Sequence, residues 1–384
     1  MQSFVVMRLS IFLLGSMMVA ASGVAAGCVG EGPRDTPAPE ADGAAPCTGA
    51  GCVDGGGPPV TDDSGSPVDA GADTSPPACT KIQVTTLAGS VEGNANGAGN
   101  VATFKGPEGI TVDPSTGTLF VADTGNGLVR KVLFDGTTST YSTTAGVSGA
   151  WIAPRHASFP AAFNTLYISD YGHDQVYSVS SDGTASSAFG LGSLKAFAVQ
   201  PTTLQMYVVG ATRVARWLAS GGFEATTFSG TFTGGFVDGA AASARYENLL
   251  DLAFDGETNL YVVDQGNHRI RKVTVTAGAN YGDVATIAGS ATAGHVDGAG
   301  AAARFEGPHG FAIDPTTHLM YVADGATIRV VTPAGEVSTL VGSTSAHADG
   351  DGCNAKFINA RSIAKFANEL FVVDVNRIRK IALN

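Results

Sequence analysis

Residues 251–273 read DLAFDGETNLYVVDQGNHRIRKV, and the same phrase returns with variations at residues 108–132, 309–331 and 361–381. Each copy holds short apolar segments separated by turn residues such as Pro, Gly, Asp and Asn. This is the pattern of an antiparallel meander of short strands. A unit repeated at this length defines the architecture before any single residue is interpreted.

The aspartate that closes the second strand of each copy counts the repeats. The positions are Asp123, Asp170, Asp264, Asp324 and Asp374, with Gly210 at the equivalent place in a divergent copy. The spacings are 47, 40, 54, 60 and 50 residues. Six units of this size, each forming one small sheet, predict an all-β fold, a six-bladed β-propeller over residues 80–384.

The two ends of the repeat region predict how the ring closes. The last unit stops after its third strand, RIRKIAL, with no fourth segment. The segment KIQVTTLAG at residues 81–89 resembles the fourth-strand segments of the other units, such as DVATIAG at 283–289. We therefore expect the N-terminal strand to complete the last blade, which removes an exposed sheet edge.

The phrase Asn267-His268-Arg269-Ile270, with its relatives at residues 126–129 and 376–378, resembles the NHL repeat. The resemblance implies a propeller that serves as a binding platform, as a partner domain or, less often, as a lyase with a metal ion in its channel. His309, beside a predicted inner strand, is the first histidine to test for such a metal. No HExxH motif or Walker loop is present, and we predict no catalytic residue, metal ligand or cofactor.

Residues 1–27 are interpreted as a bacterial lipoprotein signal peptide. Arg8 precedes the apolar run LSIFLLGSMMVAA, which is too short to span a membrane comfortably. Translation starts at Met1 or Met7. The residues Val24-Ala25-Ala26-Gly27-Cys28 resemble a lipoprotein cleavage site, which implies that Cys28 is lipidated and, because Val29 follows it, that the protein is held at the outer membrane. The alternative is plain secretion.

Residues 28–79 are rich in Pro, Gly, Ala, Asp and Ser and poor in bulky apolar side chains, so we expect a disordered tether. Residues 1–79 carry 9 acidic and 2 basic residues, a net charge of −7 out of −12 for the whole chain. The propeller therefore carries −5. An acidic, exported domain without a basic stripe is a poor partner for nucleic acid or anionic lipid.

Four further cysteines, Cys47, Cys52, Cys79 and Cys353, could form disulfides after export, and three pairings are open. We expect Cys79 and Cys353 to lie at opposite ends of the last blade. The short reach of a disulfide then argues against that pair.

The loops that lead into four blades share a second pattern, an acidic or amide residue followed seven positions later by a polar side chain and then an aromatic. The copies are Asp238/Arg245, Asp297/Arg304, Asp349/Lys356 and Asn96/Thr103. We expect each Asp to pair with the Arg or Lys seven residues on and so to hold its loop. The alternative is a ring of anion or metal contacts. For the strand-ending aspartates we expect turn capping by Asx hydrogen bonds.

Blades 2 and 3 depart from the common phrase, and the loops that lead into them are shorter. We therefore hypothesise a depression over these blades on the face where the leading loops lie. A recognition surface there comprises Trp151, Arg155, His156, Tyr171, His173 and Asp174. The alternative is that the two units have diverged and that Trp151 packs between blades.

These observations predict an exported, lipid-anchored, monomeric propeller that binds a protein, peptide or carbohydrate outside the cytoplasm. Two alternatives stay open: a metal-dependent propeller lyase or hydrolase, and a structural component of the cell envelope.

Overall fold

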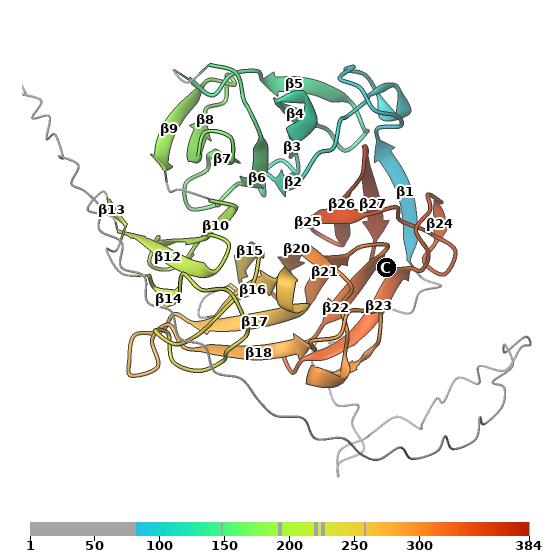
Figure 1. The fold of residues 1–384 in the computed structure, drawn as a ribbon. Coiled ribbons are helices and arrows are strands. Elements are labelled where there is room, and N and C mark those ends of the chain that lie inside the picture. The colour runs from blue at the N-terminus through green and yellow to red at the C-terminus, as the bar shows by residue number, and fades with distance from the viewer. Residues whose placement is uncertain are drawn as a thin grey trace, which may run out of the picture. The chain divides into compact units, whose positions relative to one another are not determined.

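The structure, a computed structural model, describes residues 82–146, 149–190, 194–218, 222–223, 227–256 and 259–383. Six antiparallel sheets form a ring around a central axis (Figure 1), which confirms the six-bladed β-propeller. The predicted signal peptide (1–27), Cys28 and the tether (28–79) lie outside the described residues. Among the described residues, no helix is both long enough and apolar enough to cross a membrane.

The first three blades follow one another along the chain, each from an inner to an outer strand. Blade 1 consists of β2 (Gly109–Val112), β3 (Leu119–Asp123), β4 (Leu128–Val132) and β5 (Thr138–Ser142). Blade 2 consists of β6 (Pro154–Ser158), β7 (Leu166–Asp170), β8 (Gln175–Val179) and β9 (Ala185–Gly190). Blade 3 consists of β10 (Ala196–Val199), β11 (Met206–Val209), β12 (Arg213–Leu218) and two short outer pieces, β13 (Gly222–Phe223) and β14 (Ser229–Gly230).

The other three blades carry the clearest copies of the repeat. Blade 4 consists of β15 (Leu249–Phe254), β16 (Asn259–Asp264), β17 (Arg269–Thr274) and β18 (Val284–Gly289). Blade 5 consists of β20 (Pro308–Ile313), β21 (Met320–Asp324), β22 (Thr327–Val331) and β23 (Glu336–Gly342), with the short β19 (Gly298–Ala299) on its outer edge. Blade 6 contains β25 (Ala360–Phe366), β26 (Glu369–Asp374) and β27 (Arg377–Ala382).

The N-terminal strand β1 (Gln83–Ala88) closes the ring as predicted. It pairs antiparallel with β27, with Val84 opposite Ile381, and so becomes the fourth strand of blade 6. Figure 1 shows this strand beside β27 although almost the whole domain separates them in sequence. The short β24 (Gly350–Asp351) then covers the outer edge of β1.

Turn chemistry explains why each apolar segment ends where it does. After β2, the carboxylate of Asp113 accepts hydrogen bonds from the backbone N–H of Ser115 (2.8 Å) and the hydroxyl of Thr116 (2.8 Å), which fixes the turn to β3. The fourth strand of blade 4 ends at Gly289, whose φ is +103°. A Cβ atom there would lie 2.2 Å from the carbonyl oxygen of His268, so only glycine fits.

Four short 3₁₀ turns are the only helical elements among the described residues: η2 (Gly99–Val101), η3 (Thr124–Asn126), η5 (Gln265–Asn267) and η6 (Gly300–Ala302). η3 and η5 occupy the same place in blades 1 and 4, directly after the strand-ending aspartate. Each is followed by a residue in the left-handed region, Gly127 (φ +58°) and His268 (φ +55°). The repeated Asn-Gly and Asn-His pairs therefore encode a tight turn.

The core lies between the blades and not inside them. Six clusters of buried apolar side chains each join two successive blades. The cluster between blades 2 and 3 is the smallest and consists of Val176, Leu194, Phe197 and Val208, with partly buried neighbours. Stability is thus distributed around the ring, and each blade depends on both neighbours.

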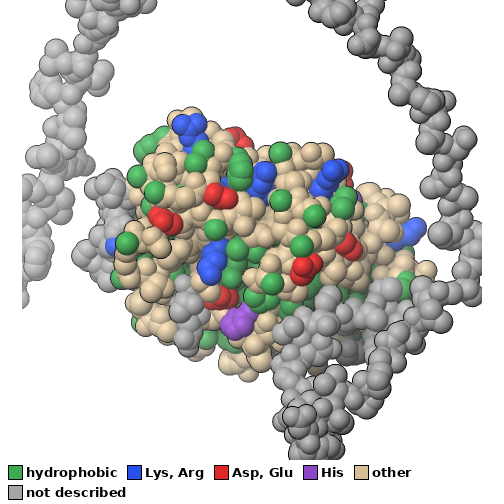
Figure 2. All heavy atoms as spheres, turned by 90° about the horizontal axis from the view of Figure 1, so that it is seen from below, with side chains coloured by type: hydrophobic (Ala, Val, Ile, Leu, Met, Phe, Trp, Pro, Cys, Tyr) green, Lys and Arg blue, Asp and Glu red, His purple; other side chains and the backbone are tan. Residues whose placement is uncertain are grey.

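One side of the propeller rim carries side chains of several chemical kinds. The side drawn in Figure 2 mixes acidic, basic and apolar side chains among the described residues. No continuous basic stripe crosses it.

The geometric objection to a Cys79–Cys353 disulfide is wrong. The loop that leads into blade 6 runs back along β1, and the backbone N–H of Gly352 donates to the carbonyl of Ile82 at 2.8 Å. Cys353 therefore lies beside the start of β1 and not at the opposite end of the blade. Cys353 is disulfide-bonded, and the other four cysteines lie outside the described residues.

Candidate functional site

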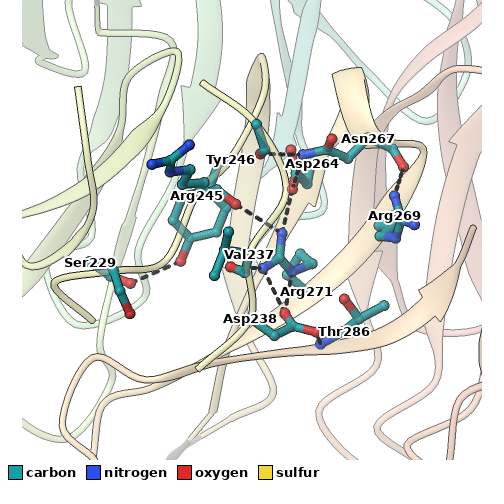
Figure 3. A network of polar contacts seen from close by, with 12 residues as sticks. Ser229, Val237, Asp238, Arg245, Tyr246, Asp264, Asn267, Arg269, Arg271 and Thr286 are labelled. Atoms are coloured by element: carbon teal, nitrogen blue, oxygen red, sulfur yellow. Dashed lines mark hydrogen bonds and ion pairs between the residues drawn. The ribbon is translucent and has the colours of Figure 1, made fainter. Parts of the chain in front are cut away.

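The most prominent polar cluster of each regular blade centres on a buried arginine in the third strand. The side chains of Arg130, Arg271, Arg329 and Arg379 have no exposed surface. In blade 4, Arg271 donates to Asp264 at 2.6 Å and to Asp238 at 2.6 Å (Figure 3). Its guanidinium also donates to the backbone carbonyls of Val237 and Arg245.

This network corrects the predicted loop pairs. Asp238, Asp297 and Asp349 do not pair with Arg245, Arg304 and Lys356, but with Arg271, Arg329 and Arg379 of the third strand. Figure 3 shows the Arg245 side chain pointing away from the network while its carbonyl accepts from Arg271. The reason is burial: a guanidinium without solvent requires several acceptors, and the leading loop provides them.

The strand-ending aspartates complete the same network. Asp123 accepts from the backbone N–H of Lys105 (2.8 Å), the amide of Asn126 (2.8 Å) and Arg130 (3.0 Å). Burial raises the pKa of the Asp123 carboxyl, and these hydrogen bonds oppose the increase. The aspartates therefore tie the leading loop to the blade. In blade 2, Asp170 also accepts from the backbone N–H of Gly172 at 3.1 Å, which is the predicted Asx hydrogen bond.

Trp151 belongs to this framework and not to a recognition surface. It is 3% exposed, and its ring packs edge-on against Tyr177 with the centroids 5.2 Å apart. Tyr177 occupies the third-strand position that holds the buried arginine in blade 1, where Arg130 lies over Phe104. Blade 2 thus replaces an arginine–aromatic stack by an aromatic pair, and Trp151 fills the place of Phe104.

A small pocket lies on the axis, where the inner strands of all six blades begin. Its volume is about 60 Å³. Each blade contributes at least one charged or titratable side chain to the wall: Glu108, Arg155, His156, Lys195, Asp251, His309 and Arg361. We call this the axial pocket. It lies on the leading-loop face, defined as the face at which the loops enter the blades.

The axial pocket is not the depression that was predicted over blades 2 and 3, because residues of all six blades line it. Arg155 and His156 of the predicted set line it. Below it, a larger cavity of about 390 Å³ follows the inner strands toward their far ends and has mainly apolar walls, with Ile110, Phe197 and Phe311 among them. His156, Asp251 and Ser362 line both cavities and mark the boundary between them.

Glu108 joins three blades at the pocket wall. Its carboxylate lies 2.5 Å from Nε of Arg155 and 3.0 Å from Nη1 of Arg361. Arg155 also lies over the ring of Tyr171, 4.8 Å from its centroid. One carboxylate is thus shared by two guanidinium groups.

Asp251 is engaged with the backbone. It accepts from the N–H of Leu252 (2.8 Å) and from the N–H of Phe311 in the next blade (3.1 Å). Nε2 of His156 lies 3.3 Å from the same carboxylate. Asp251 therefore links blades 2, 4 and 5.

Two groups of the pocket have shifted pKa values. Burial lowers the pKa of the Lys195 ammonium, and the charge of Arg155 lowers it further. Nζ of Lys195 donates to the side chain of Asn248, and no carboxylate among the described residues forms an ion pair with it. Burial lowers the pKa of His309 to about 4, with the charge of Arg361 as the next cause, so His309 is neutral at pH 7.

The remaining members of the predicted recognition surface lie further from the axis. Tyr171 is 41% exposed under Arg155. His173 bonds Asp170 at 2.8 Å, so a histidine partners the blade 2 aspartate, and Asp174 is exposed in the turn with φ +52°.

The sequence analysis did not identify Glu108, Lys195, Asp251 and Arg361. Within the described ranges, no group of three or more His, Cys, Asp or Glu residues is placed to hold a metal ion.

The NHL repeat family model matches residues 104–132. Blade 1 contains an NHL repeat. With the six-bladed ring, this match supports an NHL propeller. No curated protein matches the chain at a significant level.

Solved structures share the propeller. A structural genomics protein of unknown function from Bacteroides thetaiotaomicron has a TM-score of 0.65 at 21% identity, over 78% of this chain and 76% of that chain. An auxiliary nutrient binding protein from the same species has a TM-score of 0.63 at 20% identity, over 78% and 76%. A gluconolactonase from Xanthomonas campestris has a TM-score of 0.55 at 15% identity, over 81% and 96%. At these identities the likeness shows the fold alone.

Proposed function

We propose that this NHL propeller is a binding platform that holds a protein or peptide partner on its leading-loop face. The supporting observation is a set of aromatic and aliphatic side chains that remain exposed on the leading loops. Phe232 is 79% exposed and Ile152 is 59% exposed. Phe236 on the same loop as Phe232 is also exposed, as are Val91 and Val296 on the loops that lead into blades 1 and 5.

Arginine side chains pack over two of these aromatic rings. The guanidinium of Arg213 lies 4.2 Å from the ring centroid of Phe232, and that of Arg269 lies 3.8 Å from that of Phe236. Aromatic residues and arginine are the types that contribute most often to binding energy at protein interfaces. Rings held in place by a neighbour also lose little conformational entropy on binding.

We further propose that the platform acts outside the cytoplasm, anchored to the outer membrane through lipidated Cys28. The support is the sequence alone, namely the apolar run after Arg8 and the small residues before Cys28. A binding role is compatible with the fold, since one propeller with the same fold is an auxiliary nutrient binding protein.

Photo-crosslinking from the two faces tests the platform. A photoreactive phenylalanine analogue is placed at Phe232 or Ile152 of the full chain in the cells that produce it. The controls carry it at Leu204 and Phe134, which are exposed on turns of the opposite face. We expect a crosslinked product of one defined mass from the leading-loop face and none from the controls.

Three results contradict the platform. They are equal crosslinking from both faces, no product from either face, and a product that consists only of two copies of this chain. The last result would support a structural envelope component instead.

A further inference from the structure

We propose that the axial pocket is an anion site that receives a carboxylate group from the partner peptide or protein. The inference rests on the proposed platform, because it assigns the chemistry at the centre of the face on which the partner is held. It goes beyond the platform in naming the group that is recognised and the residues that recognise it.

The charges of the pocket wall favour an anion. Three basic side chains, Arg155, Lys195 and Arg361, line a cavity of about 60 Å³. Two carboxylates, Glu108 and Asp251, oppose them, which leaves one basic side chain in excess over the carboxylates. The propeller as a whole carries −5, so this local excess is opposite to the charge of its surroundings.

The two carboxylates already have partners. Glu108 contacts two guanidinium groups, and Asp251 accepts two backbone hydrogen bonds and faces His156. Neither carboxylate forms an ion pair with Lys195 among the described residues. The ammonium of Lys195 lies in a partly buried position beside the charge of Arg155, and both features disfavour its charged form. A bound anion would stabilise it.

Unused donors are present for such an anion. An ammonium has three N–H donors and a guanidinium has five. Lys195 uses one on Asn248, and Arg361 uses one on Glu108. Hydrogen bonds between these groups and a carboxylate are charge-assisted and therefore about twice as strong as neutral ones.

Size and surroundings favour a carboxylate on a peptide. A cavity of about 60 Å³ has room for a few water molecules, and hence for a carboxylate. The exposed groups around the face include aliphatic side chains such as Ile152 and Val296, which pack well against protein side chains. The carboxylate comes from a chain end or from an acidic side chain.

The experiment is an NMR titration of the purified full chain with ring-labelled histidine. The probes are N-acetylglycine for a chain end and N-acetylglutamate amide for a side chain, with N-acetylglycinamide as the uncharged control. Because His309 lines the pocket beside Arg361, we expect a carboxylate probe to shift the His309 signals and to raise the pKa of His309 above about 4. N-acetylglycinamide should do neither.

Two variants locate the effect. Lys195→Gln removes the charge and keeps a polar side chain, so the dissociation constant of the carboxylate probe should rise about tenfold or more. Lys131→Gln removes the same charge from β4, away from the pocket, and should leave it unchanged. Thermal unfolding of both variants shows whether they remain folded, and Arg361→Gln, with the same expected weakening, replaces Lys195→Gln should the latter not fold.

The anion site is overturned when N-acetylglycinamide shifts the His309 signals as strongly as N-acetylglycine does. It is also overturned when Lys195→Gln and Arg361→Gln bind the carboxylate probe with the same dissociation constant as the unaltered chain. Tighter binding of glucuronate or inorganic phosphate than of either peptide probe overturns the peptide carboxylate. A positive titration without any partner crosslinked from the leading-loop face would retain the anion site and reject the platform, so the two failures can be told apart.

Discussion

Arg271 is the residue on which the framework of blade 4 depends. Its side chain has no exposed surface and contacts two carboxylates and two backbone carbonyls. Replacement by Met leaves Asp264 buried without its counter-charge, so the free energy of unfolding should fall by about 3–5 kcal/mol. Urea unfolding monitored by circular dichroism measures this change.

Arg245→Met is the matched control for this prediction. Its side chain is exposed, and only its backbone carbonyl belongs to the network. Its unfolding free energy should therefore change by less than about 0.5 kcal/mol. An equal loss in both variants would restore the Asp238–Arg245 pair as the support of the loop.

His309 makes the stability depend on pH. Its pKa is about 4 in the folded chain and 6.5 at its ordinary value, so the unfolded chain binds more protons between these two pH values. Stability is therefore lost as the pH falls from 6.5 to 4, by about 3 kcal/mol from this group. The charged groups that act on His309 are Arg361, Glu108 and Asp251.

Comparing the pH dependence of stability in two histidine variants isolates the contribution of His309. His309→Gln should lose less stability than the unaltered chain between pH 7 and pH 4, whereas His318→Asn, at an exposed position where φ is +57°, should follow the unaltered chain. Thermal unfolding at several pH values provides the comparison. Parallel curves for all three proteins would show that His309 titrates normally.

At the residue scale, the sequence predicted which positions repeat in each blade, but it did not predict which side chains pair with one another. The Asp–Arg pairs were misassigned because residues seven apart in a loop seemed closer than residues 33 apart, such as Asp238 and Arg271. Trp151 had a usable signal. It stands 19 residues before Asp170, as Phe104 stands 19 before Asp123, so its framework role could have been derived from spacing.

Among the strands, β1 closes the ring although it has only six residues. It closes blade 6, and Val84 is fully buried in the cluster between blades 5 and 6. Val84→Asp places an unpaired charge there and should lower the free energy of unfolding by about 3 kcal/mol or more. Thr85→Asp, on the exposed side of the same strand, should have a small effect.

Urea unfolding of the two variants in parallel measures the contribution of ring closure. Equal urea midpoints for Val84→Asp and Thr85→Asp would contradict a stabilising role for the packing of β1 in blade 6.

At the scale of elements, apolar alternation and turn residues were sufficient to predict the four-stranded units and the closing strand. They could not predict that the outer strand of blade 3 is divided into β13 and β14. Nor could they predict that the leading loops of blades 5 and 6 add short strands on the outer edges. These features depend on contacts between loop and blade, for which a strand pattern has no signal.

For the whole molecule, the axial pocket was the hardest feature to predict. Its residues stand 13 to 15 positions before the strand-ending position of their blades, from Glu108 before Asp123 to Arg361 before Asp374. That offset places one polar residue from each blade at the axis. The residue type differs from blade to blade, however, so no repeated motif marks the site. Only the closed ring brings these side chains together.

In the proposed arrangement, Cys28 attaches the whole molecule to the membrane. If Cys28 carries the lipid, Cys28→Ser should move the protein from the membrane pellet to the soluble exported fraction and abolish incorporation of a labelled fatty acid. Cys47→Ser removes a cysteine from the predicted tether and should leave the protein in the pellet. Each acyl methylene buried in a bilayer stabilises attachment by about 0.8 kcal/mol, so loss of the lipid chains should release the protein completely. A Cys28→Ser protein that still sediments with the membrane would show that the attachment does not depend on this cysteine, and the partner on the leading-loop face would then be the first candidate for holding it there.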